Sequence, residues 1–144
     1  MKDHDDTLNR FLTAQQPIYL QVLKELGNGK KTTHWMWFIF PQIEGLGLST
    51  TAKYFSIKNK KEASDYLIHP LLGKRLLECC GIILQIENKS ADVIFGFPDN
   101  AKLRSCMTLF KSIAPHEKVF EAVLQKYFSG QPDEKTISIL QNQL

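Results

Sequence analysis

The sequence has few cysteines, and their arrangement does not suit a disulfide framework. Its 144 residues include only Cys79, Cys80 and Cys106, and the first two are adjacent. An adjacent pair rarely bridges, because neighbouring Cα atoms lie only about 3.8 Å apart and a disulfide usually needs more. An odd count also leaves one thiol over. We therefore expect three reduced thiols, which favours a cytoplasmic location.

Long apolar runs are also lacking. The longest, residues 35–40, is far shorter than the roughly 20 residues that a membrane-spanning helix needs. The first six residues, Met-Lys-Asp-His-Asp-Asp, do not have the apolar region of a signal peptide. We expect a soluble protein with no membrane partner.

The excess of positive charge is small. Lys and Arg total 18 and Asp and Glu total 15, so the formal net charge is +3. Nucleic-acid-binding proteins usually carry a concentrated basic face, so the sequence does not favour a nucleic acid as the partner, although it is compatible with a small anionic ligand. Apolar residues make up 43% of the chain, an ordinary globular value that argues against disorder.

The apolar residues recur mostly at spacings of three and four, which predicts helices. Helices are expected over residues 8–12, 17–26, 49–55, 59–68, 70–87, 98–112, 117–128 and 133–141. Residues 90–95 fit either a strand or a helix, and no alternating strand pattern persists anywhere. No linker divides the chain, so residues 1–144 are expected to form one domain. The predicted fold class is all-α, a single compact multi-helix domain of about seven to nine helices.

Polar residues at several predicted helix starts are typical of N-caps. Ser49 precedes one expected helix, and Asn59 is followed three residues later by Glu62, as in a capping box. Asp99 or Asn100 is expected to cap the helix that begins near residue 98. Gly73 lies inside the expected helix 70–87 at a cost of roughly 1 kcal/mol against alanine, for which close helix packing is the favoured reason.

Residues 34–42, HWMWFIFPQ, form the most aromatic segment. On a helix its large side chains would point in all directions, so the segment is either buried all round or lines a cavity on one side. A flat aromatic wall of Trp35 and Trp37 would be a stacking surface for a nucleobase. His34 and Gln42 place polar atoms at its two ends. Both interpretations, a core helix and a ligand wall, stay open on the sequence.

Residues 99–105 place two cations near a predicted helix start. Lys102 and Arg104 there oppose the helix dipole, by roughly 0.3–1 kcal/mol each. A phosphate docked on free N–H groups at the helix start would reverse that effect, and Ser105 would add a hydroxyl donor. The alternative is that the two cations are solvated, or that Arg104 pairs with a carboxylate elsewhere.

Motifs for cofactor or metal chemistry are lacking. The four histidines are scattered, and no His/Cys pair has the spacing of a zinc site. There is no phosphate-binding glycine loop, no dinucleotide fingerprint and no nucleophile elbow. Cys79 and Cys80 lie among leucines and isoleucines, which favours core packing. We therefore expect no metal and no cofactor, and the residues assign no catalytic group.

Four segments carry a resemblance to a known family: HWMWFIFPQ at 34–42, GLGLS at 45–49, YLIHPLLGKRLLE at 66–78 and KLRSCMTLF at 102–110. Together they resemble domain-of-unknown-function family 1810. The resemblance implies a small all-helical cytoplasmic domain of bacterial type and supplies no activity. Members sometimes carry the label calpastatin, a disordered inhibitor, which this compact and apolar sequence does not support.

A weaker resemblance is to the NADAR proteins, helical domains that process ADP-ribose and related nucleotides. Tyr54-Phe55, residues 63–75 with their Gly-Lys-Arg ending, and residues 107–136 are similar to NADAR segments. NADAR enzymes place a glutamate shortly before that tyrosine, whereas this chain has Thr-Ala-Lys at 51–53. Breaking an N-glycosidic bond needs a carboxylate, so binding would survive here where hydrolysis does not. Glu44 or Asp99 would replace that glutamate only if it folds nearby.

These observations lead us to expect a pocket that binds a small anionic nucleotide-like ligand related to ADP-ribose or NAD. The expected ligand-binding residues are His34, Trp35, Trp37, Gln42, Tyr54, Asn100, Lys102, Arg104 and Ser105. We expect His34, Trp37, Gln42 and Arg104 to share one cavity. If the protein is an enzyme, an N-glycosidic hydrolase is the expected class. The alternative is a non-catalytic protein-interaction module whose aromatic segment is simply core. The sequence does not determine the oligomeric state.

Overall fold

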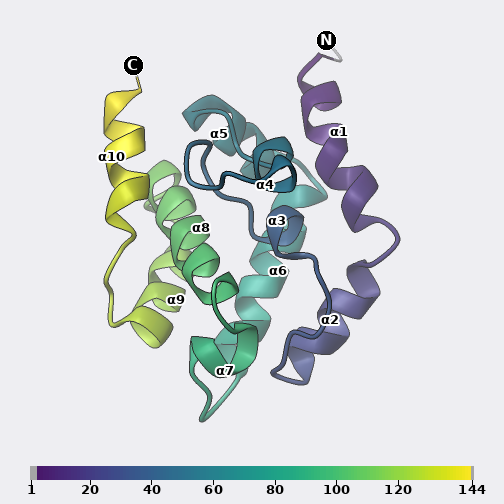
Figure 1. Cartoon of the computed structure of the whole chain (residues 1–144), viewed down its shortest axis with the longest axis vertical. Helices are drawn as coiled ribbons and strands as arrows, with labels where there is room; N and C mark the ends of the chain where they lie inside the picture. Colours follow the sequence, from purple (N-terminus) through teal and green to yellow (C-terminus); the bar gives the residue numbers. More distant parts are fainter. Residues whose placement is uncertain (1–2, 144) are drawn as a thin grey trace.

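In a computed structural model, which describes residues 3–143, the chain forms ten helices and no strand (Figure 1). They are α1 (Asp3–Gln15), α2 (Tyr19–Gly27), α3 (Met36–Ile39), α4 (Thr50–Tyr54), α5 (Lys60–Ile68), α6 (Leu72–Gln85), α7 (Ala91–Phe95), α8 (Asp99–Ile113), α9 (Lys118–Phe128) and α10 (Glu134–Asn142). The all-α prediction is confirmed. The count exceeds seven to nine because the aromatic segment and residues 90–95 contain α3 and α7, which are too short for their periodicity to show.

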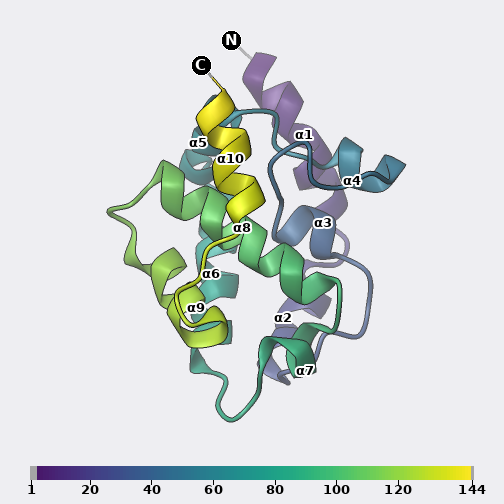
Figure 2. The ribbon, with the colours of Figure 1, turned by 60° about the vertical axis from the view of Figure 1, so that its left-hand side comes forward.

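The two longest helices, α6 and α8, run through the middle of the molecule (Figures 1 and 2). α6 packs against α2, α5 and α9, while α8 packs against α5, α7, α9 and α10. Fully buried side chains of both helices, among them Leu76 and Phe110, belong to one hydrophobic core. The two termini lie at one end of the molecule, and α2 and α7 lie at the other.

Several helix starts have the caps that the sequence predicts. Ser49 accepts a hydrogen bond from the Ala52 amide, and Asn59 accepts one from the Glu62 amide at 2.9 Å. Two further caps that the sequence analysis does not include, Ser90 and Asp133, precede α7 and α10 and accept hydrogen bonds in the same way. Each cap satisfies an amide that has no partner within its own helix.

The predicted cap of α8 is wrong. Asp99 is already the first residue of that helix, and Pro98 precedes it without a side-chain cap. The first amides of α8 are bonded by other means: Asn100 N donates to Gly96 O and Lys102 N donates to Pro98 O. The carboxylate of Asp99 is consequently free to pair with lysines, as described below.

Close packing explains Gly73, as predicted. A Cβ atom at this position would lie 1.9 Å from the carbonyl oxygen of Leu67, at the corner where α5 leads into α6. Gly81, further along the same helix, has no atom within 4 Å of its Cβ position. Only the first glycine is therefore demanded by the packing.

The three cysteines are buried and unpaired, as the sequence predicts. Cys79 and Cys80 of α6 and Cys106 of α8 all belong to the core, and Cys80 Sγ lies 3.7 Å from Met107 Sδ. Among residues 3–143, no helix has both the length and the apolar character that crossing a membrane requires.

Candidate functional site

The polar connection between α2 and α3 is fixed by a buried carboxylate. Glu25 is 3% exposed and accepts hydrogen bonds from the Thr32 and Thr33 amides, the Thr33 hydroxyl and the Trp35 indole. Gln21 donates a fifth at 2.9 Å. Burial alone would raise the pKa of Glu25, but these hydrogen bonds outweigh it and lower the pKa to about 2. The carboxylate therefore stays charged, and it holds the backbone just before His34 and the side chain of Trp35 just after it.

Lys31, which directly precedes Thr32, connects this segment to α7 and α8 through two contacts. Its amide donates to Ile94 O at 2.8 Å, and its Nζ lies 2.8 Å from Asp99 Oδ2. Lys102 Nζ lies 3.6 Å from Asp99 Oδ1, so two ammonium groups share one carboxylate. The Lys31 side chain is only 7% exposed. This is a partly buried ionic arrangement with one positive charge in excess.

A pocket of about 460 Å³ opens beside these charges, and we call it the α8 pocket. Its lining includes Lys31, His34, Trp37, Phe97, Asp99 and Lys102. Lys102 Nζ lies 4.8 Å from the centre of the Trp37 ring, a cation–π distance. The pocket thus combines aromatic faces, ammonium groups and an exposed imidazole.

A second pocket, of about 320 Å³, shares Phe97 with the α8 pocket, and we call it the Arg104 pocket. It is lined by Asp92, Phe97, Asn100, Arg104, Tyr127 and Phe128, among others. Arg104 Nε donates to Gln131 O at 2.9 Å, and its guanidinium lies 5.8 Å from the centre of the Phe128 ring. The Asn100 side-chain amide donates to the Asp92 carboxylate.

The structure separates the sequence-predicted site residues into groups. His34, Trp37 and Lys102 line the α8 pocket, whereas Asn100 and Arg104 line the Arg104 pocket. Gln42 lines neither. The prediction that His34, Trp37, Gln42 and Arg104 share one cavity is therefore wrong. Lys102 and Arg104 are two positions apart on α8, a spacing that turns their side chains to different sides of a helix.

Two predicted site residues are buried instead. Trp35 is 1% exposed and donates its indole N–H to Glu25 Oε1 at 2.9 Å, so its ring offers no face to a ligand. Ser105 is 5% exposed and its hydroxyl donates to Ala101 O at 3.1 Å, within its own helix. The prediction that these two residues bind a ligand is therefore wrong. The side chains of Trp35 and Ser105 face the interior, because the packing of neighbouring helices covers them.

The predicted phosphate cradle at the start of α8 also needs correction. The Asn100 and Lys102 amides donate to Gly96 O and Pro98 O, and the Ala101 amide donates to the Asn100 side chain at 2.8 Å. These donors are already satisfied, so they do not form an open anion site. An anion near this end of α8 would be held by the lysine side chains.

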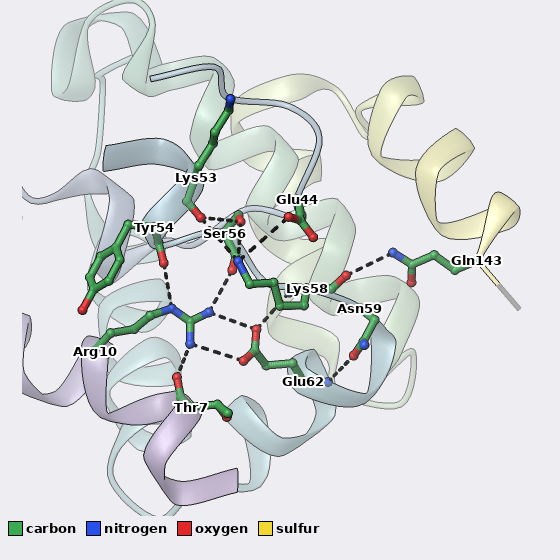
Figure 3. Close-up of polar contacts among 10 residues, drawn as sticks. All are labelled: Thr7, Arg10, Glu44, Lys53, Tyr54, Ser56, Lys58, Asn59, Glu62 and Gln143. Atoms are coloured by element: carbon green, nitrogen blue, oxygen red, sulfur yellow. Dashed lines mark hydrogen bonds and ion pairs between the residues drawn. The ribbon is translucent and has the colours of Figure 1, made fainter. Parts of the chain in front are cut away.

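Tyr54 lies in a different place, at a shallow, largely apolar pocket of about 680 Å³ formed by α1, α4 and α5 (Figure 3). There the Arg10 guanidinium donates to the carbonyl oxygens of Thr7, Tyr54 and Ser56 and pairs with Glu62. Glu62 Oε1 also accepts the Lys58 amide at 2.9 Å. The Arg10 guanidinium and the Glu62 carboxylate are both fully engaged with neighbouring groups (Figure 3), which favours a structural role for this pair.

Of the two carboxylates considered as replacements for the NADAR glutamate, Asp99 lines the α8 pocket, whereas Glu44 lines none of the pockets described above. Glu44 Oε2 lies 3.9 Å from Lys58 Nζ, and the Glu44 side chain is half-exposed. Asp99 lies in the α8 pocket between two lysines. In the part of the chain that the structure describes, no group of three or more His, Cys, Asp or Glu side chains is placed to hold a metal ion.

Several residues that line these pockets are absent from the predicted site, among them Lys31, Phe97 and Phe128. Lys31 lies in a polar connection that gave no motif, and its role depends on Asp99, 68 residues away in the sequence. In the sequence, Phe97 and Phe128 are indistinguishable from ordinary apolar residues. Phe97 is nevertheless 85% exposed, a property that only the fold could reveal. An aromatic residue directly before a proline at a helix start was the available signal.

Comparisons with known proteins identify relatives without an assigned function. The family model described as "Protein of unknown function (DUF1810)" matches residues 5–140. A solved structure, the conserved hypothetical protein Rv1873 from Mycobacterium tuberculosis, is 46% identical, with a TM-score of 0.93. The match covers 94% of this chain and 97% of that one. No curated protein matches significantly. Neither match supports the NADAR resemblance.

Proposed function

This chain belongs to the DUF1810 family, whose function is unknown, and from the geometry of the α8 pocket we propose that it binds a small anionic, nucleotide-like ligand there. One observation carries the proposal. Lys31 and Lys102 share the single carboxylate of Asp99, which leaves one positive charge in excess beside aromatic rings.

The charge excess favours an anion. The Lys31 ammonium is desolvated, because its side chain is only 7% exposed, and Asp99 is its 2.8 Å partner. Lys102 is the more distant of the two cations, at 3.6 Å, and its side chain is 20% exposed. A phosphate entering the pocket would therefore meet Lys102 first. A charge-assisted hydrogen bond of this kind contributes roughly 1.5–3 kcal/mol.

The aromatic side chains favour a planar ring in the same ligand. Trp37 is half-buried and Phe97 is exposed, and both line the pocket beside His34. Stacking of a base on an aromatic side chain contributes roughly 1–3 kcal/mol. The pocket volume of about 460 Å³ lies in the usual range for small-molecule sites, about 300–1,000 Å³. Nucleotides combine these two chemistries.

The proposal is binding and does not include hydrolysis. Asp99 is the carboxylate in the α8 pocket, and both of its oxygens face ammonium groups. A general base or a stabiliser of an oxocarbenium-like centre needs a carboxylate free to approach water or the sugar. The pairing of Asp99 favours a positioning role for it, in which it holds the two lysines.

A protein-interaction module is the second candidate, and one observation favours it. Val93 and Phe97 are 54% and 85% exposed at the end of the molecule where α7 lies. Trp35, Met36, Ile39 and Phe40 are also buried, so most of the aromatic segment is core, as that alternative requires. A partner covering Phe97 would occupy the same face as the ligand.

AMP titration with tryptophan emission as the readout tests the proposal. Of the two tryptophans only Trp37 lines the pocket, so AMP should quench the wild-type emission, and Trp37→Phe should abolish the quenching. Lys102→Ala should weaken AMP binding about ten- to a hundredfold. Lys74→Ala, an exposed lysine on α6, is the charge-matched control and should leave the affinity unchanged. Absence of AMP binding, or equal affinities for Lys102→Ala and the wild type, would refute the proposed site.

A further inference from the structure

Phe97 lines both the α8 pocket and the Arg104 pocket. Its side chain is 85% exposed, and it lines one pocket together with His34 and Trp37 and the other together with Phe128. The two pockets are therefore neighbours that share one aromatic wall. A ligand bound in one of them can continue past Phe97 into the other.

The first turns of α8 divide their side chains between the two pockets. Asp99 and Lys102, three positions apart, line the α8 pocket, while Asn100 and Arg104, four positions apart, line the Arg104 pocket. Spacings of three and four place side chains on the same face of a helix, so each pocket receives one face of α8. Each of the two pockets thus contains a cation and aromatic rings.

The charges of the two pockets differ. The α8 pocket holds two lysines and one aspartate, whereas the Arg104 pocket holds one arginine and one aspartate. The anionic part of a ligand is therefore favoured on the Lys102 side. The Arg104 pocket suits a second planar group, because Phe97, Phe128 and the flat guanidinium all offer faces on which a ring can stack.

Arg104 retains donors for such a group. The structure gives Nε a hydrogen bond, to Gln131 O, and within residues 3–143 it records none for the two terminal nitrogens. Arg104 is only partly buried and lines the pocket, so a ligand there can approach its guanidinium. They can donate to ring nitrogens or to hydroxyl oxygens.

We propose that the two pockets form a single two-part site and that its ligand is of the dinucleotide type, with two planar rings joined by a phosphate bridge. This inference rests on the proposed function, since it places the first ring and the phosphates in the α8 pocket. The second ring then lies beyond Phe97, against Arg104 and Phe128. Arg104 is a specificity-determining residue that distinguishes the dinucleotide from a mononucleotide.

The test compares AMP with diadenosine diphosphate, in which two AMP units share a phosphate bridge. Affinities of the wild type, Lys102→Ala and Arg104→Ala are measured by isothermal titration calorimetry, with Lys74→Ala as the charge control. The wild type should bind the dinucleotide at least tenfold more tightly than AMP. Arg104→Ala should weaken dinucleotide binding about tenfold and leave AMP binding unchanged, while Lys102→Ala should weaken both. A thermal unfolding curve shows that Arg104→Ala remains folded, and Arg104→Gln serves as a second variant if it does not.

The outcomes separate this inference from the proposed function. If AMP binds and depends on Lys102, but the dinucleotide gains nothing or Arg104→Ala has no selective effect, the two-part site is refuted and the α8 pocket stands. If neither compound binds, both proposals fail. A loss of AMP affinity in Arg104→Ala equal to the loss for the dinucleotide would also overturn the assignment, because it would place the mononucleotide in the Arg104 pocket.

Discussion

The indole nitrogen of Trp35 lies 2.9 Å from Oε1 of Glu25, and both residues are buried. A tryptophan that the sequence offers as a ligand wall is thus a structural partner of a buried carboxylate. The same carboxylate fixes Thr32 and Thr33, which flank the α8 pocket together with His34. The shape of the candidate site consequently depends on a residue that does not line it.

Glu25→Gln should lower the free energy of unfolding by about 2–4 kcal/mol at neutral pH, because an amide cannot accept from all the donors that face the carboxylate. Denaturant unfolding monitored by circular dichroism measures the change. Glu87→Gln, at an exposed position, is the control and should change stability by less than about 0.5 kcal/mol. Equal stabilities of the two variants would contradict the structural role of Glu25.

The same carboxylate predicts a pH dependence. The pKa of Glu25 falls from 4.5 to about 2 on folding, so its contribution to stability is complete above the unfolded value and decreases as the pH falls from about 5 to 2. Wild-type stability should decline over this window more steeply than that of Glu25→Gln. Parallel pH profiles for the two proteins would show that the carboxylate is not held in its charged form.

A pair of glycines in α6 provides a matched test of packing. Gly73→Ala should destabilise the protein by about 3 kcal/mol or more, because its Cβ would lie 1.9 Å from the Leu67 carbonyl oxygen, which belongs to the backbone and cannot rotate away. Gly81→Ala meets no atom within 4 Å and should raise stability by roughly 0.5–1 kcal/mol through helix propensity. Opposite signs in thermal unfolding are the expected result, and equal signs would be inconsistent with the α5–α6 packing.

The Arg10–Glu62 ion pair should contribute far more to the free energy of unfolding than the exposed Lys61–Asp65 pair of α5. Both side chains are about 10% exposed, and a terminal nitrogen of Arg10 on α1 lies 3.0 Å from Glu62 Oε1 on α5 (Figure 3). Arg10→Ala leaves a buried carboxylate without its partner, so it should cost about 3–5 kcal/mol in the free energy of unfolding. Lys61→Ala, which breaks the exposed Lys61–Asp65 pair, should cost less than about 0.5 kcal/mol. Similar losses in the two variants would show that the Arg10 cluster is not structural.

The three thiols should be unreactive in the folded protein. Burial raises the pKa of the Cys79 thiol to about 12, and it raises the pKa values of Cys80 and Cys106 well above the usual range. Because the thiolate is the reacting form, a colorimetric disulfide reagent at pH 8 should label the native protein slowly. Unfolding in guanidinium should expose all three thiols to rapid labelling. A thiol that reacts in the native protein as fast as free cysteine would contradict the buried placement.

The sequence by itself determined the fold class, the positions of the longer helices and two of the helix caps, Ser49 and Asn59. These features are local: apolar spacing, Ser49 and Asn59 act within a few residues, so no long-range contact is needed to predict them. Gly73 and the buried cysteines belong to the same group, because their neighbours in the sequence already indicate the packing. The helix count came out low because single-turn helices such as α3 and α7 have no period to detect.

The tertiary structure alone decided which predicted site residues meet. Trp35 and Trp37 are the same residue type two positions apart, yet one is buried against Glu25 and the other lines the α8 pocket. Lys102 and Arg104 are likewise divided between two pockets, and Lys31 meets Asp99 across 68 positions. The local sequence already shows that side chains two positions apart lie on different faces of a helix. Which of these faces is buried depends on helices that are distant in the sequence. The burial of a given side chain is therefore decided only when those helices pack together.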